Sequence, residues 1–198
     1  TAEAYSIPVV LVFNKVDIYD KSAMEEMAVW REVYESIGYE SVVTSAVEAI
    51  GLEEVKALLD HKVTLLSGHS GVGKSTLINA IEPGLDLKTA EVSDSHNKGK
   101  HTTTYAEVFP LSNEGFIIDT PGIKGFGLID IPKEELHHYF PEMFALLPEC
   151  KFHNCLHLTE PGCAVVKAVE SGRVPETRYH SYRTMYEQDG DETYRGAF

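Results

Sequence analysis

The stretch SGHSGVGKSTL, at residues 67–77, has the pattern G-x-x-x-x-G-K-[ST] of a phosphate-binding loop. In such a loop the glycines let backbone N–H groups close around phosphate oxygens, while the lysine reaches the outer phosphates and the serine hydroxyl ligates Mg²⁺. We predict Lys74 and Ser75 in these two roles. The residues predicted to surround a bound nucleotide are Gly68, His69, Ser70, Gly71, Val72, Gly73, Lys74, Ser75 and Thr76. The alternative is a plain glycine-rich turn between a strand and a helix.

A second motif, N-K-x-D at Asn14, Lys15 and Asp17, is suited to read a guanine base. The Asp17 carboxylate can accept two parallel hydrogen bonds from the ring N–H and the exocyclic amine of guanine, and adenine offers no such pair. Ser45 and Ala46 end the apolar run SVVTSA, and we predict that a backbone N–H there packs against the same base. Standing alone, N-K-x-D could merely start a turn.

Asp119 and Gly122 form the pattern D-x-x-G at the end of GFIIDTPG. An acid at this place can hold Mg²⁺ through water, and a glycine amide can meet a γ-phosphate. The polar segment at residues 88–104 ends in threonines able to supply a second hydroxyl to Mg²⁺, and Thr103 is our candidate among them. Together with the two preceding motifs, these are the functional parts of a GTPase.

These motifs require strands and a helix that bring them together. Apolar runs at residues 7–13, 41–46, 62–67 and 115–119 predict four strands. The first is expected to be covered on both faces and the third to be buried, while KSTLINAI predicts a helix from Lys74. Since the motifs follow the carboxyl ends of strands, they should gather at one edge of a sheet.

The base-reading motif precedes the phosphate loop, which reverses the order found in ordinary GTPases. A site assembled from several strand ends does not depend on where the chain begins, so the usual cycle of motifs has been opened at a different point. We predict an α/β fold with a circularly permuted P-loop GTPase domain over residues 1–130.

All three cysteines lie close together near the carboxyl end of the chain, and two histidines lie among them. Thiolates and an imidazole form a tetrahedral set for which zinc is the natural occupant, and either His153 or His157 has a suitable place. A lone reduced cysteine is usually a small core residue, but the clustering favours a metal site. We predict a small, mainly helical zinc-binding domain over residues 131–198, with the cysteine ligands Cys150, Cys155 and Cys163.

Cations and aromatics mix in the segment after the cysteines, at Arg173, Arg178, Tyr179, Tyr182 and Arg183. These side chains could contact the phosphates and bases of RNA. The alternative is a helix that packs its tyrosines on the metal-binding module. The formal net charge of −14 argues against binding nucleic acid by bulk electrostatics.

No signal peptide and no apolar run long enough to span a bilayer is recognisable in the sequence. We therefore expect a soluble, cytoplasmic protein that does not bind a membrane. At 198 residues and 43% hydrophobic, the chain can bury one good core and a small appendage.

The permuted order, together with GHSGVGKSTL, GKHTTT and DTPG, resembles the ribosome small subunit-dependent GTPase A family, the circularly permuted GTPases of the YjeQ/EngC type. The resemblance implies Mg²⁺-dependent hydrolysis of GTP to GDP and phosphate, stimulated by the small ribosomal subunit during its late maturation, with binding to its rRNA. It also implies an OB-fold domain and further GTPase elements before Thr1, which this sequence does not contain. We expect a monomer.

Two site residues depend on this resemblance. The spacing C-x4-C-x-H-x5-C is similar to the zinc motif of the family and selects His157. The family's pattern G-x-H-T-T is matched from Gly99 to Thr103, which supports His101 as the group that orients the attacking water. Ras-type GTPases use a glutamine for this, where Ile123 stands here. A solvated loop histidine is the alternative for His101.

Two other functions are compatible with the same motifs. One is a nucleotide-gated RNA- or ribosome-binding switch with negligible intrinsic catalysis. The other is a zinc-bearing RNA-binding module whose nucleotide site is merely structural. Measurable turnover of GTP that rises with small ribosomal subunits would distinguish the enzyme from both.

Overall fold

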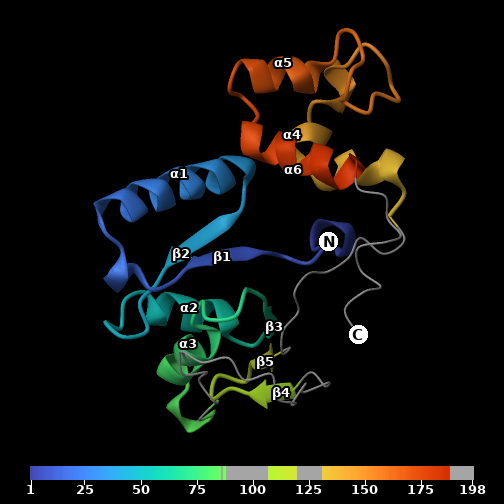
Figure 1. Cartoon of the computed structure of the whole chain (residues 1–198). Coiled ribbons are helices and arrows are strands. Elements are labelled where there is room, and N and C mark those ends of the chain that lie inside the picture. Colours follow the sequence, from blue (N-terminus) through green and yellow to red (C-terminus); the bar gives the residue numbers. More distant parts are fainter. Residues whose placement is uncertain (86, 88–106, 120–130, 188–198) are drawn as a thin grey trace, which may run out of the picture. The chain divides into compact units, whose positions relative to one another are not determined.

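The structure is a computed structural model that describes residues 1–85, 87, 107–119 and 131–187 of the chain (Figure 1). It divides into two compact units, which are described separately. One unit is Val10–Gly125, and the other combines Thr1–Val9 with Phe126–Phe198. The fold class predicted from the sequence, α/β with a mainly helical second part, is confirmed.

The unit Val10–Gly125 begins with a β-α-β element. Its strands β1 (Val10–Phe13) and β2 (Glu40–Val43) are parallel neighbours, and α1 (Lys21–Ile37) connects them. α1 starts after Asp20, whose carboxylate accepts a hydrogen bond from a backbone N–H in the first turn. It ends at Gly38, whose φ of 105° is the left-handed conformation that commonly stops a helix.

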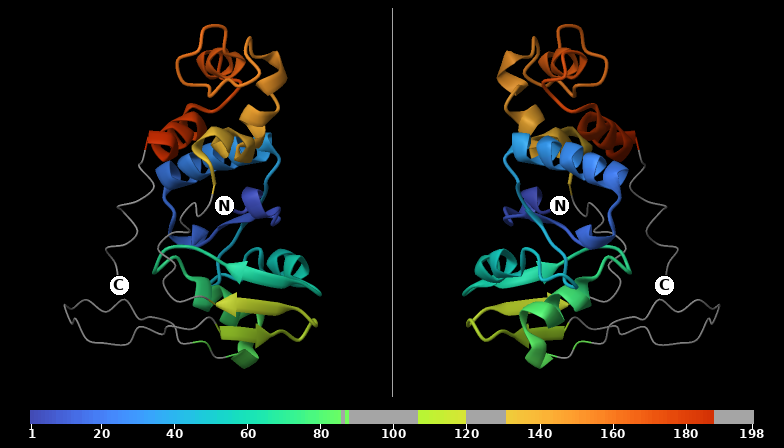
Figure 2. Two further views of the ribbon diagram at one scale, coloured as in Figure 1. Left: turned by 90° about the vertical axis from the view of Figure 1, so that its right-hand side faces the viewer. Right: turned by 90° about the vertical axis from the view of Figure 1, so that its left-hand side faces the viewer.

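A second sheet, of three strands, carries the rest of this unit. Its order is β3 (Val63–Leu66), β5 (Phe116–Asp119) and β4 (Glu107–Pro110), with β3 parallel and β4 antiparallel to β5 (Figure 2). α2 (Leu52–Leu59) precedes β3, and α3 (Lys74–Ile81) follows it. Short 3-10 helices are η2 (Val16–Ile18) and η3 (Pro83–Leu85). The four predicted strands are confirmed, but within the described residues they lie in two sheets, and β4 was not predicted.

One apolar core fills this unit on one side of the strands. Its buried members are Val42, Val55, Leu59, Leu77, Ile78, Ile81, Leu87, Leu111 and Ile117. On the other face of the three-stranded sheet, Val63 (67% exposed), Val108 and Phe116 face solvent. The predictions that the run 7–13 forms a strand covered on both faces and that the run 62–67 forms a buried strand are wrong for the described residues, because Val12 in β1 and Val63 and Leu65 in β3 are exposed. For the three-stranded sheet, the cause is that α2 and α3, which supply most of this core, pack against a single face.

The second unit is helical in the residues that the structure describes. Its α-helices are α4 (Pro141–Phe144), α5 (Ala164–Glu170) and α6 (Glu176–Glu187), and its 3-10 helices are η1 (Glu3–Tyr5), η4 (Lys133–Tyr139) and η5 (Leu147–Glu149). The buried core is Leu136, Phe140, Met143, Leu146, Cys155, Cys163, Ala164, Val165, Ala168, Val174 and Tyr182. Across the described parts of both units, no helix is long and apolar enough to cross a membrane.

Gly51 and Gly38 form a matched pair for testing how tightly β2 and α2 pack. Both have positive φ, so alanine at either should cost about 1–2 kcal/mol of backbone strain. A Cβ on Gly51 would also lie 2.2 Å from the carbonyl oxygen of Val43, whereas a Cβ on Gly38 meets nothing within 4 Å. Urea denaturation should therefore show Gly51→Ala to be less stable than Gly38→Ala by a further 1–3 kcal/mol, roughly. Equal losses would contradict the close packing.

Candidate functional site

The phosphate loop is the turn between β3 and α3, as the sequence predicted. Gly71 and Gly73 adopt φ of 83° and 93°, a conformation that L side chains rarely adopt. Gly73 is also the residue just before α3, and a Cβ there would lie 2.6 Å from Nδ2 of Asn14. Glycine is favoured here by its positive φ, and any side chain would also have to displace the amide of Asn14 from the base-reading loop.

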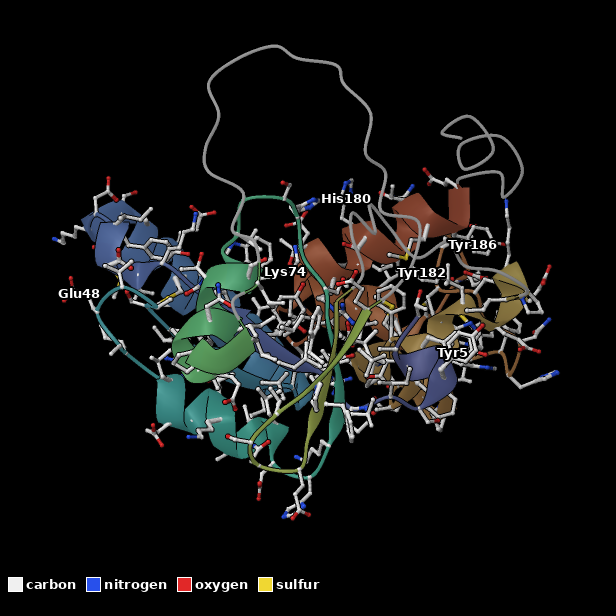
Figure 3. The ribbon with its side chains drawn as sticks, turned by 90° about the horizontal axis from the view of Figure 1, so that it is seen from below. Tyr5, Glu48, Lys74, His180, Tyr182 and Tyr186 are labelled. Carbon is white, nitrogen blue, oxygen red and sulfur yellow. The ribbon has the colours of Figure 1, made fainter. Side chains whose placement is uncertain are left out.

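Lys74 is the first residue of α3, and its ammonium turns back over the loop (Figure 3). Nζ donates hydrogen bonds to the carbonyl oxygens of Gly68 (2.6 Å) and His69 (3.1 Å). The N-terminus of a helix favours anions because its first N–H groups lack partners within the helix. With the ammonium beside it and the half-buried Ser75 next along the helix, this end of α3 can hold a phosphate group and a Mg²⁺ ligand.

The base-reading loop is joined to the phosphate loop by two side chains. Nδ2 of Asn14 donates to the carbonyl of Val72 (3.0 Å), and Nζ of Lys15 donates to the carbonyl of Gly71 (2.5 Å). The Oδ1 of Asn14 accepts a bond from the hydroxyl of the fully buried Thr44 (3.0 Å), which fixes the orientation of the amide. Sequence analysis did not single out Thr44, although its place at the end of β2 was the available signal.

Asp17 is held by Ser45, whose hydroxyl donates to its Oδ1 at 2.5 Å. Ser45 is fully buried, while Asp17 is exposed. The backbone N–H of Ser45 is paired with the carbonyl of Ile50 (3.1 Å), so the predicted contact of an N–H with the base rests on Ala46. The structure thus brings together Asn14, Lys15, Asp17, Ser45 and the phosphate loop, which lie in three separate stretches of the sequence.

The remaining nucleotide-site predictions fall mainly outside the described residues. His101, Thr103 and Gly122 lie there, so their roles stay predictions. Asp119 is the last residue of β5, and its backbone is the register partner of Leu66, the last residue of β3. The D-x-x-G pattern therefore starts beside the strand that leads into the phosphate loop.

The cysteines and His157 form one cluster in the second unit. The ligand atoms of Cys150, Cys155, His157 and Cys163 all lie within 4.8 Å of one another. Nδ1 of His157 lies 3.6 Å from Sγ of Cys150 and 3.4 Å from Sγ of Cys163. His153, the rival ligand in the sequence, is exposed and does not belong to the cluster. The four donors can hold a tetrahedral metal ion.

Burial makes this cluster costly to ionise without a cation. Burial raises the pKa of the Cys155 thiol to about 12 and also raises the pKa of Cys163, whereas it lowers the pKa of His157 to about 4. Two backbone N–H groups at the start of α5 donate to sulfur, that of Ala164 to Cys150 (3.3 Å) and that of Val166 to Cys163. Backbone N–H groups that point at sulfur stabilise the thiolate form of cysteine, which is the form that binds a metal ion. The four side chains therefore fit a bound metal ion.

Glu160 organises the loop that carries His157. Its carboxylate accepts hydrogen bonds from the backbone N–H groups of Leu156 (2.8 Å), Leu158 (2.8 Å) and Thr159 (3.0 Å). Burial alone would raise the pKa of Glu160, but these backbone hydrogen bonds outweigh it and lower the pKa. Sequence analysis missed this residue, because a lone glutamate gives no local signal of such a role.

The same loop is also held by two tyrosines of α6, of which Tyr182 is labelled in Figure 3. The hydroxyl of Tyr179 donates to the carbonyl of His157 (2.7 Å), and that of the fully buried Tyr182 donates to the carbonyl of Leu156 (2.5 Å). These tyrosines therefore pack on the metal-binding module, which is the alternative given above for this segment, and they are not placed to stack on RNA bases.

Arg178 is also used inside this unit. It forms an ion pair of 2.8 Å with Glu142, in which both side chains are largely buried, and it lies over the ring of Phe140. Arg173 and Arg183 are more exposed and pair with Glu149 and Glu187, respectively. Of the residues expected to meet RNA, these two arginines are the ones left near the surface.

Comparison with known proteins identifies relatives for most of the chain. The RsgA GTPase family matches over residues 1–129. The chain is 52% identical to the small ribosomal subunit biogenesis GTPase RsgA of Bacteroides fragilis and 54% identical to that of Phocaeicola vulgatus. Each alignment covers all of this chain and 64% of the relative, so the chain spans less than two thirds of their length.

Two solved structures are similar to this fold. YjeQ from Thermotoga maritima matches with a TM-score of 0.79 and 39% identity, over 93% of this chain and 61% of that one. YloQ, described as a circularly permuted GTPase, matches with a TM-score of 0.74 and 33% identity, over 93% of this chain and 58% of the other. The permuted order predicted from the motifs is therefore confirmed.

Replacing Glu160 should weaken the second unit in a pH-dependent way. The pKa of Glu160 in the folded protein lies below its ordinary value of 4.5. The ionised carboxylate therefore stabilises the folded state fully above pH 4.5, and this stabilisation is lost as the pH falls through the lowered pKa. Glu160→Gln should lower the free energy of unfolding at pH 7 by about 1–2 kcal/mol, since the carboxylate is partly solvated. The difference between parent and variant should shrink below pH 4.5.

Chemical denaturation at a series of pH values measures this difference. Glu170→Gln, at the exposed end of α5, is the matched control and should stay close to the parent throughout. A difference between Glu160→Gln and the parent that does not change with pH would contradict the role of the charge.

Proposed function

Because the chain belongs to the RsgA GTPase family, we propose that it binds GTP and hydrolyses it to GDP and phosphate. The observation that carries this proposal is the contact between the two nucleotide loops, in which Asn14 and Lys15 bond to the carbonyls of Val72 and Gly71. This contact fixes the distance between the base-reading loop and the phosphate loop. A nucleotide that fits both needs a guanine base and a phosphate chain.

Each half of the site has its own task in this proposal. Asp17 accepts the two donors of guanine while Ser45 holds its carboxylate in place. Lys74 exchanges its bonds with the loop carbonyls for bonds to the outer phosphates, and Ser75 ligates Mg²⁺. When bound, Mg²⁺ neutralises charge on the phosphate oxygens. The residues proposed to surround the phosphates are those predicted from the sequence, Gly68 to Thr76.

The hydrolytic step is assigned to residues around the D-x-x-G pattern. Asp119 and Thr103 support the Mg²⁺ site, Gly122 meets the γ-phosphate, and His101 orients the attacking water. The start of this pattern beside β3 supports the assignment of Asp119. The other three assignments rest on the sequence alone.

We assign the small ribosomal subunit and its rRNA as partners. The support is that relatives at 52% and 54% identity are named small ribosomal subunit biogenesis GTPases. Since the proposed partner is the small ribosomal subunit, we also propose that the protein acts in the cytoplasm. The exposed Arg173 and Arg183 of the second unit are the cations of that segment able to reach a phosphate by releasing their own carboxylate partners.

We also propose that the second unit holds zinc through Cys150, Cys155, His157 and Cys163. The support is the closeness of the four donors and the backbone N–H groups aimed at sulfur. Zinc favours tetrahedral thiolate and imidazole ligands, and a cation removes the cost of ionising buried thiols. Because all four ligands come from the protein, the metal has a structural role.

Exchange of Asp17 tests the base reader. Asp17→Asn should weaken GTP binding by at least about 10²-fold. The variant should also bind xanthosine triphosphate, because the asparagine amide can donate a hydrogen bond to the carbonyl that replaces the exocyclic amine of guanine. The measurement is competition of both nucleotides against a fluorescent guanine nucleotide. Glu48→Gln removes a nearby exposed carboxylate and should keep the preference for GTP. An Asp17→Asn variant that binds GTP as well as the parent would eliminate the assignment.

Phosphate release from GTP, with and without small ribosomal subunits, tests the enzyme. We expect slow turnover that rises on addition of the subunits, and His101→Ala should reduce the stimulated rate on the order of 10²-fold while GTP affinity is kept. His96→Ala, in the same segment, is the control and should behave as the parent. Tight binding of GTP without turnover under any condition would favour the nucleotide-gated switch. An unchanged rate for His101→Ala would leave hydrolysis in place and remove His101 from it.

A further inference from the structure

Three buried imidazole nitrogens beside the cysteine cluster lack hydrogen-bond partners. They are both ring nitrogens of His137, which is 4% exposed, and Nε2 of the fully buried His157. No other buried side-chain nitrogen or oxygen in the described ranges is left without a partner. Since an unpartnered buried polar group costs free energy, the concentration of all three at one place requires a physical explanation.

The two rings face each other closely. Their centroids are 4.9 Å apart and their planes are nearly perpendicular, at 89°. His137 lies in η4, twenty residues before His157, so this contact is made by the fold and not by local sequence. Ring centroids at this separation permit a direct N–H···N bond of the ordinary length of about 3 Å once the rings tilt toward each other.

If His157 binds the metal ion, its second ring nitrogen needs a hydrogen-bond acceptor. His157 turns Nδ1 to the sulfurs of Cys150 and Cys163, so Nδ1 is the nitrogen that would bind the metal ion. The proton of a neutral imidazole must then be on Nε2, where it needs an acceptor. Metal-binding histidines nearly always donate this second N–H to a neighbouring group, which fixes the tautomer and the orientation of the ring.

Among the rings and charged groups around His157, His137 is the one whose ring nitrogens have no hydrogen-bond partner. The carboxylate of Glu160 already accepts hydrogen bonds from three backbone N–H groups, and the carbonyl of His157 accepts one from Tyr179. His138 packs on His137, at 4.3 Å between centroids, and on Phe144. A neutral His137 offers one lone pair and one N–H of its own.

We propose that His137 is the positioning residue of the metal site, accepting a hydrogen bond from Nε2–H of His157. This inference rests on the proposed zinc site and adds a residue that holds its histidine ligand. His137 is not itself a ligand, because its nitrogens do not belong to the four donor atoms that lie within 4.8 Å of one another. A role in packing alone would require only the volume of its ring.

Four variants of the whole chain, loaded with zinc, separate positioning from packing. His137→Leu keeps an apolar volume and removes the acceptor, while His137→Asn and His137→Gln each supply an amide oxygen, near the places of Nδ1 and Nε2 respectively. His138→Leu changes the exposed neighbour and is the matched control. Zinc affinity is measured by competition with a chromophoric chelator.

We expect His137→Leu to bind zinc about 10–100-fold more weakly, the usual effect of losing such a partner, and His138→Leu to match the parent. At least one amide variant should recover most of the affinity. A parent-like affinity for His137→Leu, or amide variants as weak as His137→Leu, would overturn the proposal.

The parent protein supplies a test that does not depend on the variants folding. In long-range ¹H–¹⁵N spectra, the zinc-loaded parent should show a proton on Nε2 of His157 that exchanges slowly with water and is hydrogen-bonded to nitrogen. Absence of this proton signal in a zinc-loaded protein overturns the proposal for His137 alone. Elemental analysis that finds no zinc in the parent overturns both this proposal and the zinc site.

Discussion

The hydrogen bonds between the base-reading loop and the phosphate loop are the interaction on which the nucleotide half of the fold depends. Two side chains of one loop bond to successive carbonyls of the other, and the absence of a side chain at Gly73 permits the approach. The loops follow strands of different sheets. Because side chains and not chain connections join them, the site does not depend on the order of its pieces, and a permuted chain can build it.

Fixed spacings in the sequence single out the proposed nucleotide-site residues, and the structure brings the N-K-x-D side chains into contact with the glycine-rich loop. The residues that support these loops were not predicted. Thr44 and Glu160 act through contacts with groups that no spacing reveals, and both were missed. The strand Glu107–Pro110 was missed because its residues are mostly exposed and form no apolar run, so that its pairing with β5 is visible only in the fold. Apolar runs likewise predicted strands correctly while overstating how far they are buried.

In the second unit, the proposed metal ligands also belong to the packed core. Cys155 and Cys163 are members of the apolar core as well as the donor set, and Tyr182 combines core packing with a hydrogen bond to the ligand loop. Since a helical unit this small has little apolar surface to bury, the proposed zinc would contribute strongly to its stability. Composition and clustering left two candidate histidines, and the family resemblance favoured His157. The fold agrees with that choice, because His157 is buried among the cysteines and His153 is exposed.

The fit of Gly73 against Asn14 has a consequence for how such a chain can evolve. A Cβ at position 73 would meet the amide of Asn14, so a substitution in the proposed phosphate loop would also disturb the proposed base-reading loop. Effects of substitutions in the two motifs should therefore not add, as expected for residues in contact. Sequence drift in either motif is constrained by the other, although almost sixty residues separate them in the chain.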